Sequence, residues 1–553
     1  MLDRSLVDSL FPANLAEREE WETRYPDRKL PEGARVTRFS PSPTGPLHIG
    51  GIYVAMIDKD LADQSGGRYV VRIEDTDKAR EVPGMMEQFT RAFDYFDLEP
   101  DESEPTGGDY GPYTQSARAE IYLTYVRDLL RDGLAYLCFA TREELADIAL
   151  RQQRAKVPTG YYGQWALWRD SPVAEVEEAL AAGRPFVVRF RSNAASGARV
   201  SYEDALRGRL EFDANHNDVV ILKSSEQTLP LPTYHFAHVV DDHLMRVNLV
   251  VRGDEWLSSV PVHLQLFDAL GFERIEYAHI APLLKRDGNG KRKLSKRKDP
   301  EATVDFYLQA GYPPESVLYY LRGLANGRLA ELPLREALSA RLDLSACGVS
   351  GAMVDMVKLA GICADQIATM PGERVLEAVA DWAAFYDPEL GRVLAEERDL
   401  ALRALAIERE GVANPRKDLQ KWSDFRPVYG YFFPQLFTPV TDLTGQPLEG
   451  LPGDVVREFA ANFADAYQPI AEPAAWFEQL RRIAAANGFA ATPGEYKAAR
   501  DAYHGSIREA SQIVRIALTG STRSPDLYQV AMTLGTDEVL RRVRTLNGTA
   551  RTV

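Results

Sequence analysis

Residues 42–51 gather several phosphate-binding groups in one short stretch. The stretch contains the hydroxyls of Ser42 and Thr44, the imidazole of His48, and a run of backbone N–H groups that ends at Gly50 and Gly51. Donors of this kind suit the phosphates of a nucleotide, above all where a strand turns into a helix. A lone histidine in a turn is equally compatible with a structural role. The elements around this stretch therefore decide how it is interpreted.

The flanking sequence predicts that this stretch lies at the carboxyl end of a parallel sheet. Residues 36–40 are apolar enough for a short buried strand, and the prolines that follow exclude regular structure directly after it. A helix is expected beyond Gly51, because apolar residues recur there at helical spacing, with a left-handed stop at Gly66. Residues 69–73 predict the next strand. This βαβ unit is typical of nucleotide-binding folds.

Charged side chains stand at the ends of two predicted strands. Glu74 directly follows residues 69–73. Arg252 is the last of the almost wholly apolar residues 248–252, and Glu255 comes shortly after them. Because ligands bind beside the carboxyl ends of strands in open α/β sheets, we expect these three groups to converge on one crevice. Residues 275–280 predict the last strand before a basic loop. In that loop, residues 285–298, eight of fourteen residues are Lys or Arg.

Composition is that of an ordinary soluble protein. With 553 residues, 45% apolar and 26% charged, the chain should form roughly three to five domains. Its net charge of −16 argues against indiscriminate nucleic-acid binding but allows a local basic track. Cys138, Cys347 and Cys363 lack paired spacing, which favours a reducing compartment over a disulfide framework. No apolar run reaches signal-peptide or membrane-spanning length, so we expect a cytoplasmic protein without membrane contact.

Two further regions depart from the βα rhythm. Residues 117–225 contain short β runs around an aromatic segment, residues 161–168, and predict an inserted domain. These aromatics could stack on unpaired bases, but each could also belong to a core. From about residue 300 to 553, strong helix formers dominate and β alternation is scarce. That region should be helical.

Seven short motifs follow one another along the chain. They are Pro-Ser-Pro-Thr-Gly-Pro-Leu-His-Ile-Gly-Gly at 41–51, Glu-Asp-Thr-Asp at 74–77, Gly-Pro-Tyr-Thr-Gln-Ser at 111–116, Thr-Tyr-His-Phe-Ala at 233–237, Val-Val-Asp-Asp-His at 239–243, Arg-Gly-Asp-Glu-Trp at 252–256 and Lys-Leu-Ser-Lys-Arg at 293–297. In this order they resemble the class I aminoacyl-tRNA synthetases in their glutamyl form, from the His-Ile-Gly-His signature to the Lys-Met-Ser-Lys-Ser loop. The resemblance is dense over about residues 35–325.

The resemblance implies an α/β fold with a class I Rossmann-like parallel-sheet catalytic domain, an inserted α+β acceptor-binding domain and an all-α C-terminal anticodon-binding region. The implied divisions are an N-terminal extension (1–33), the two catalytic halves (34–116 and 226–280), the acceptor-binding insert (117–225), a stem-contact region with the Lys-Leu-Ser-Lys-Arg loop (281–365) and helical anticodon-binding domains (366–553). Helices in the anticodon-binding region are typical of the bacterial glutamyl type, whereas the glutaminyl enzymes have β-barrels there. Residues 513–520 also resemble the final domain of the bacterial glutamyl type.

The resemblance also implies an activity and a set of site residues. The activity is glutamate–tRNA ligation: ATP activates L-glutamate, which is then transferred to the terminal adenosine of tRNA(Glu). The implied catalytic residues are His48, Lys293 and Lys296. The implied ATP-binding residues are Ser42, Thr44, Gly45, His48, Gly50, Gly51, Glu255, Trp256, Lys293, Ser295 and Lys296, and the implied glutamate-binding residues are Arg38, Ser40, Ser42, Glu74, Tyr234 and Arg252. Mg²⁺ is expected to arrive with ATP, and the protein is expected to be a monomer.

Several of these residues have structural alternatives. Arg38 could close a structural salt bridge, Tyr234 could belong to the core, and a Lys-x-Ser-Lys run could be solvated surface. Residues 241–243 contain metal-binding residue types, but the family treats this turn as structural, so no metal site is predicted there. Some family members hold zinc in the insert through a Cys-x-Cys pair and a later Cys. Here Cys138 stands alone in the insert, so no zinc is expected.

Three functions compete on this sequence. The first is glutamate–tRNA ligase. The second is a paralogue that glutamylates a modified tRNA base, although such proteins lack the long helical region. The third is a catalytically silent RNA-binding protein, against which the phosphate-handling residues argue. The sequence leaves open whether tRNA(Gln) is also charged, what residues 1–33 do, and how the longer loop at residues 225–231 affects the site.

Overall fold

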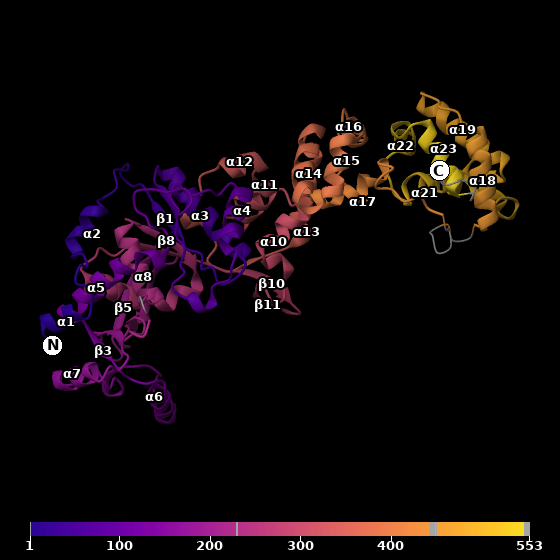
Figure 1. Ribbon diagram of the computed structural model, residues 1–553. Helices are drawn as coiled ribbons and strands as arrows, with labels where there is room; N and C mark the ends of the chain where they lie inside the picture. The colour runs from indigo at the N-terminus through magenta and orange to yellow at the C-terminus, as the bar shows by residue number, and fades with distance from the viewer. Residues whose placement is uncertain (1, 228–229, 442–447, 449–450, 547–553) are drawn as a thin grey trace. The chain divides into compact units, whose positions relative to one another are not determined.

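The computed structural model describes residues 2–227, 230–441, 448 and 451–546. The chain divides into two compact units (Figure 1). The first comprises Met1–Leu308 and Leu318–Asp355, and the second comprises Gln309–Val317 and Met356–Val553. Among the described residues, no helix combines the length and the apolar character needed to cross a membrane. The predicted domain boundaries stay predictions.

A parallel sheet stands at the centre of the first unit. Strand β1 (Val36–Phe39) pairs in parallel with β2 (Arg68–Val71), and β8 (Leu249–Gly253) pairs in parallel with β9 (Glu276–Ile280). The two pairs join at Val36, whose C=O accepts from the Asn248 N–H at 3.1 Å and whose N–H donates to Asn248 Oδ1 at 2.9 Å. The spatial order β2-β1-β8-β9 therefore places a topological switch point between β1 and β8, where open α/β sheets bind ligands.

The helix predicted between Gly51 and Gly66 is confirmed, and two further helices belong to this part of the fold. Helix α3 (Ile49–Ser65) joins β1 to β2 and ends at Gly66 with φ of 68°, a left-handed conformation that glycine adopts without a Cβ clash. Helix α9 (Val260–Leu270) joins β8 to β9 and ends in the same way at Gly271. Helix α4 (Met85–Phe96) buries Phe89, Phe93 and Phe96 on one face.

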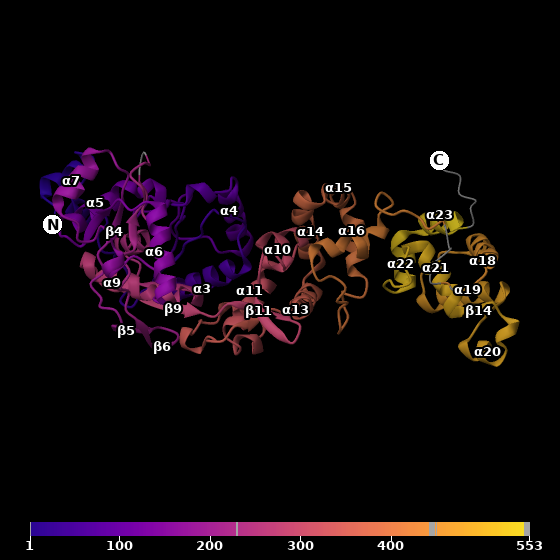
Figure 2. The same cartoon turned by 90° about the horizontal axis from the view of Figure 1, so that it is seen from below.

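The insert contains a sheet and a hairpin. Strands β3 (Ala135–Cys138), β4 (Val187–Phe190) and β7 (Val220–Leu222) form an antiparallel sheet, accompanied by α6 (Arg142–Ala155) and α7 (Val173–Ala181). Strands β5 (Arg199–Asp204) and β6 (Gly208–Asp213) form the hairpin. Its turn returns to the central sheet, since the Ala205 N–H donates to Tyr277 O on β9 at 2.8 Å, and Figure 2 shows the hairpin beside that strand.

Two local predictions are wrong. Residues 275–280 are not the last strand before a basic loop, because the basic segment itself folds into a hairpin of β10 (Leu283–Asp287) and β11 (Gly290–Lys293), and β10 also pairs with β12 (Ala352–Met353). Its two-residue turn, Gly288-Asn289, is of the kind that joins twisted strands. Residues 241–243 do not lie in a turn. They lie near the end of helix α8 (Tyr234–Leu244), which precedes the strand predicted at residues 248–252, here β8.

Asp241 and Asp242 explain why that helix is buried. Asp241 accepts from Gln115 Nε2 at 2.9 Å and from Arg118 Nε at 2.6 Å, while Asp242 accepts from Arg72 Nη1 at 2.5 Å. These side chains are all fully buried. A buried ion pair retains its charges only when hydrogen bonds satisfy both partners, so residues 241–242 hold arginines rather than a metal.

The N-terminal residues pack on α5 (Ala119–Arg131) instead of trailing free. Helix α1 (Arg4–Ser9) contacts α5 through Asp8, which pairs with Arg131 Nε at 2.7 Å. Helix α2 (Arg18–Arg24) follows, and its Trp21 Nε1–H donates to Thr124 Oγ1 at 3.1 Å. The extension is therefore part of the first unit.

The second unit is helical, as predicted. Helices α15 and α16 are separated by Glu397. The helices from residue 304 onward are α10 (Val304–Ala310), α11 (Pro314–Ala325), α12 (Leu334–Ser339), α13 (Met356–Thr369), α14 (Gly372–Tyr386), α15 (Pro388–Glu396), α16 (Arg398–Ala406), α17 (Phe425–Tyr429), α18 (Gly453–Ala466), α19 (Pro473–Ala486), α20 (Pro493–Ala498), α21 (Ile507–Thr519), α22 (Leu527–Leu534) and α23 (Thr536–Leu546). The short strands β13 (Phe489–Ala490) and β14 (Gly505–Ser506) pair in parallel.

Candidate active site

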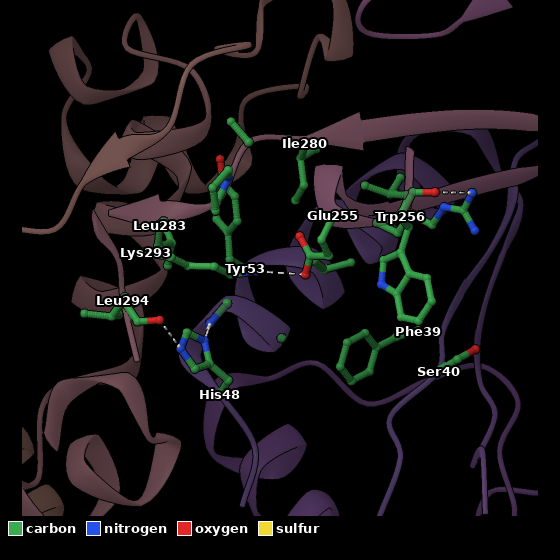
Figure 3. A pocket seen from close by; sticks show the side chains of 18 of the residues that line it. Phe39, Ser40, His48, Tyr53, Glu255, Trp256, Ile280, Leu283, Lys293 and Leu294 are labelled. Carbon is green, nitrogen blue, oxygen red and sulfur yellow. Dashed lines mark hydrogen bonds and ion pairs between the residues drawn. The ribbon is translucent and has the colours of Figure 1, made fainter. Parts of the chain in front are cut away.

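A cavity of about 750 Å³ lies at the switch point of the sheet (Figure 3). Its walls come from the ends of β1, β8 and β9, from the start of α3 and from the basic hairpin. The predicted site residues that line it are Arg38, Ser40, His48, Gly50, Gly51, Glu74, Tyr234, Arg252, Glu255, Trp256, Lys293, Ser295 and Lys296. Three predicted residues, Ser42, Thr44 and Gly45, do not line it, and the two hydroxyl residues are exposed.

At one end of the cavity, Arg252 is a buried cation without an ion-pair partner in the described part of the chain. It is 5% exposed, and its Nε–H donates to His279 Nε2 at 3.0 Å. Its Nη1 lies 3.3 Å from His263 Nδ1 and 3.5 Å from the Tyr234 hydroxyl. Burial lowers the pKa of both imidazoles, which are therefore neutral. The positive charge of Arg252 is left for an anion in the cavity.

Arg38 stands beside Arg252 but is already paired. Its Nε lies 3.4 Å from Asp242 Oδ2, and its Nη2 lies 3.3 Å from His238 Nδ1. Although burial alone would raise it, the pKa of Asp242 lies well below its usual range because Arg72 and Arg38 face it. The structural salt bridge considered for Arg38 is thus present, and Arg38 nevertheless lines the cavity.

Glu74 and Ser40 carry polar groups with unused hydrogen-bonding capacity. Glu74 Oε1 lies 3.3 Å from Arg72 Nη2, and burial raises the pKa of Glu74 against the opposing charges of Arg72 and Arg38. The Ser40 hydroxyl is buried and has no hydrogen-bond partner among the described residues. Buried polar groups are normally paired, so this end of the cavity is suited to a ligand with several polar groups.

At the other end, the two phosphate-binding segments meet at His48. Its Nδ1 accepts from the Gly50 N–H at 2.9 Å, which assigns the proton to Nε2 and makes Nε2–H the donor to Leu294 O at 3.3 Å (Figure 3). Burial lowers the pKa of His48. A Cβ on Gly50 would stand 2.9 Å from His48 Nδ1, and one on Gly51 would stand 3.1 Å from Phe39 Cζ. Glycine is required at both positions by this close packing.

The lysines of the basic hairpin are held at the cavity rim. Lys293 Nζ pairs with Glu255 Oε1 at 3.0 Å, and Lys296 Nζ donates to Pro46 O at 2.6 Å. Trp256, with its ring centroid 4.6 Å from that of Tyr234, forms the wall between the two ends. Cationic donors thus surround one end of the cavity and a buried guanidinium stands at the other.

Sequence reasoning missed several lining residues. Tyr53 follows Gly50 by one helical turn, so the helical spacing could have identified it. Leu283 lies in the cavity wall only because the basic segment forms a hairpin. The imidazoles of His263 and His279 contact Arg252. No local sequence pattern around either histidine predicts that contact.

The insert contains Cys138 without metal partners. Its Sγ lies 3.4 Å from the Tyr161 hydroxyl. Tyr161 belongs to a small hydrophobic core of the insert, so for this residue the core role considered above is the one observed. Within the described residues, no group of three or more His, Cys, Asp or Glu side chains could hold a metal ion. The predicted loop at residues 225–231 includes positions 228–229, which lie outside the described residues.

We expect purified protein to contain far less than one zinc per chain, because a single thiol cannot build a tetrahedral site. Elemental analysis after dialysis against a chelator measures this directly. About one zinc per chain, retained after chelation, would mean that a site exists outside the side chains described above.

Comparison with known protein families matches both ends of the chain. A family model described as the catalytic domain of class I tRNA synthetases (E and Q) matches residues 35–360, and a model described as an anticodon binding domain matches residues 495–546. The first match contains every residue that lines the cavity.

Individual proteins match over nearly the whole chain. Glutamate–tRNA ligases from Sorangium cellulosum and Clostridium beijerinckii are each 40% identical to it, over 95% and 97% of this chain and 97% and 98% of their own lengths. A crystal structure of a glutamate tRNA ligase from Elizabethkingia meningosepticum in complex with its amino acid aligns with a TM-score of 0.73 at 27% identity, and the alignment covers 94% of this chain and 100% of that one.

Proposed function

This chain belongs to the class I tRNA synthetases of the glutamyl and glutaminyl group, and from that premise we propose that it is a glutamate–tRNA ligase. One observation carries the choice of amino acid: the buried guanidinium of Arg252 lines the cavity, and no carboxylate of the described residues pairs with it. The curated relatives that match over nearly its full length bear the same activity in their names.

Glutamate would occupy the end of the cavity at Arg252. A planar guanidinium binds a carboxylate through two parallel hydrogen bonds. The side-chain carboxylate of the substrate would therefore be the negatively charged partner of Arg252. Arg38 and the Tyr234 hydroxyl add donors beside it, and the Glu74 carboxylate would accept hydrogen bonds from the α-ammonium group. The positive charge of that ammonium would lower the pKa of Glu74 and so oppose the effect of burial, which raises it. The free Ser40 hydroxyl is the remaining polar contact at this end.

ATP would occupy the end at His48. The close backbone of Gly50 and Gly51 admits the nucleotide, and Glu255, Trp256 and Ser295 complete its surroundings. Lys293 and Lys296 must exchange their present acceptors, Glu255 and Pro46 O, for phosphate oxygens. Ser42, Thr44 and Gly45 stay predictions, since they lie outside the cavity. The described residues offer no cluster of acidic ligands, in keeping with Mg²⁺ that arrives bound to the phosphates of ATP.

The first step joins the two ends. An α-carboxylate oxygen of glutamate attacks the α-phosphorus of ATP, the bond from that phosphorus to the bridging oxygen of pyrophosphate breaks, and pyrophosphate leaves with the electron pair. Negative charge grows on oxygens near His48, Lys293 and Lys296, whose donors stabilise it. In the second step a ribose hydroxyl oxygen of the terminal adenosine attacks the glutamyl carbonyl carbon, and the hydroxyl proton passes to a phosphate oxygen of the adenylate. The bond from the carbonyl carbon to the bridging phosphate oxygen breaks, and AMP leaves with the electron pair.

The other parts of the chain would hold tRNA. The insert at residues 117–225 would bind the acceptor end, residues 281–365 the stem, and residues 366–553 the anticodon, for which the match at residues 495–546 to an anticodon binding domain is the support. A monomeric state, a cytoplasmic location and discrimination against tRNA(Gln) stay predictions.

An aminoacylation assay separates this function from its alternatives. Purified protein is incubated with ATP, labelled glutamate or glutamine, and tRNA(Glu) or tRNA(Gln), together with the same tRNAs lacking the terminal adenosine. We expect glutamate on intact tRNA(Glu), none on the truncated tRNA, and no glutamine on either acceptor. Label on the truncated tRNA would identify the base-modifying paralogue, and no label on any tRNA would support the silent RNA-binding protein.

A further inference from the structure

The turn of the insert's β5–β6 hairpin brings a buried carboxylate to the back of the glutamate pocket. Asp204, the last residue of β5, is 2% exposed. Its Oδ1 accepts from the backbone N–H groups of Leu206 at 3.0 Å and Arg207 at 2.9 Å, which close the turn. Its Oδ2 lies 2.6 Å from His279 Nδ1 on β9. Oδ1 also lies 3.4 Å from the backbone nitrogen of His279, so Asp204 joins the turn to β9 through both of its oxygens.

Asp204 assigns the tautomer of His279. A carboxylate only accepts hydrogen bonds, so the proton on the imidazole belongs to Nδ1. His279 is fully buried, and burial lowers its pKa, so Nε2 stays unprotonated and accepts from the Arg252 Nε–H at 3.0 Å. Asp204, His279 and Arg252 therefore form a chain of hydrogen bonds that begins in the insert and ends in the cavity wall.

His279 makes the shortest hydrogen bond to Arg252. The other polar contacts of the guanidinium are longer: 3.3 Å to His263 Nδ1, 3.4 Å to Trp256 O and 3.5 Å to the Tyr234 hydroxyl. Each of these partners is neutral. The Nε contact therefore holds the guanidinium most tightly, and its Nη groups make longer contacts with neutral groups and with no carboxylate among the described residues.

We infer that Asp204 and His279 are positioning residues that set the preference of this site for glutamate. The inference rests on the proposed function. A fixed, neutral acceptor behind Arg252 orients the guanidinium while preserving its charge, so the pocket binds a carboxylate more strongly than an amide. Through Asp204, the insert contributes to the choice of amino acid although it lines no part of the glutamate pocket.

Replacing Asp204 by asparagine tests the tautomer directly. The backbone N–H groups of Leu206 and Arg207 require an oxygen at the Oδ1 position, so the nitrogen of the introduced amide must face His279 Nδ1. That nitrogen donates, so His279 must move its proton to Nε2, where it opposes the Arg252 Nε–H. Two donors then face each other in a buried site, and an unsatisfied buried donor is costly.

For Asp204→Asn we expect the KM for glutamate in glutamate-dependent pyrophosphate exchange, run with tRNA present, to rise about 10-fold or more. The KM for ATP and the kcat at saturating glutamate should stay within about threefold, since the donors around the phosphates are untouched. The preference for glutamate over glutamine should fall by a similar factor. Asp213→Asn, on the exposed far end of the same hairpin and paired with Arg199 at 2.7 Å, is the matched control and should behave as wild type.

Two substitutions at His279 keep the test decisive if Asp204→Asn does not fold. The amide of His279→Gln can offer its oxygen to Arg252 and its nitrogen to Asp204, and His279→Leu offers neither. The glutamine variant should retain a lower KM for glutamate than the leucine variant, by about fivefold or more.

Equal losses in the glutamine and leucine variants would overturn the inference, because packing alone would then explain His279. A folded Asp204→Asn with wild-type KM for glutamate would also overturn it, as would equal damage to the parameters for glutamate and ATP. Failure of the proposed function is a separate result: the wild-type protein itself would not catalyse glutamate-dependent exchange.

Discussion

Replacing Lys296 by alanine is expected to lower the rate of glutamyl-adenylate formation about 100-fold or more, because one charged donor is lost where negative charge develops. Lys296 Nζ now rests on Pro46 O at the cavity rim and has no ion-pair partner among the described side chains. Its charge is therefore available to phosphate at no cost in broken salt bridges. Single-turnover formation of adenylate, measured with tRNA present, gives the rate.

The control for this prediction is Lys298→Ala. Lys298 belongs to the same basic segment, is exposed and does not line the cavity. Both variants lose one positive charge, so both should weaken tRNA binding to a similar, small extent. Only Lys296→Ala should slow adenylate formation. Equal rates for the two variants would contradict a role for Lys296 at the phosphates. The Lys-x-Ser-Lys run would then be a solvated surface segment.

The second large effect concerns the choice between glutamate and glutamine. The two amino acids differ by one oxygen against one NH₂, so shape does not separate them. Arg252 and Arg38 offer only donors, and the amide of glutamine would turn its own donors toward them. The wild-type protein should therefore prefer glutamate by about 1,000-fold or more in kcat/KM, as sites built for one polar group reject its mismatch.

Arg252→Gln should remove most of that preference. The substitution deletes a buried charge that has no counter-ion in the described part of the chain, so the KM for glutamate should rise steeply while the KM for ATP stays nearly unchanged. Arg297→Gln, the same exchange at an exposed position of the cavity rim, serves as the control. Wild-type kcat/KM for glutamate in Arg252→Gln would make Arg252 structural and would reassign the pocket to Arg38 and Tyr234.

Local patterns were sufficient to predict the frame of the site. The strand at residues 36–40, the glycine stop at Gly66 and the apolar strand before Arg252 each follow from a few neighbouring residues. The β10–β11 hairpin was missed because its strands are charged on both faces, which hides the alternation that identifies a strand. Helix α8 was missed because its buried carboxylates resemble turn residues until their arginine partners are known.

The charge balance of the pocket lay beyond sequence reasoning altogether. The resemblance implies the same glutamate-binding role for Arg38 and Arg252, yet among the described residues Arg38 is paired with a carboxylate, that of Asp242, and Arg252 is not. The difference arises from contacts between residues far apart in the chain, as does the approach of Asp204 to His279. Such contacts depend on how the insert docks on the sheet, and no local pattern of residues encodes that docking.

Pairing of β10 on both of its edges changes the entropy of nucleotide binding. Because β10 pairs with both β11 and β12, the backbone of the basic segment is already ordered as far as Leu294, whose N–H donates to Leu283 O at 2.9 Å. Fixing the backbone of one residue costs roughly 1–2 kcal/mol. The residues that follow are held as well, since the Ser295 N–H donates to Asp299 Oδ2 at 3.0 Å and the Asp299 N–H donates to Ser295 O at 2.9 Å. Nucleotide binding therefore orders little further backbone here, and most of the binding energy from Lys293 and Lys296 is left for the reaction itself.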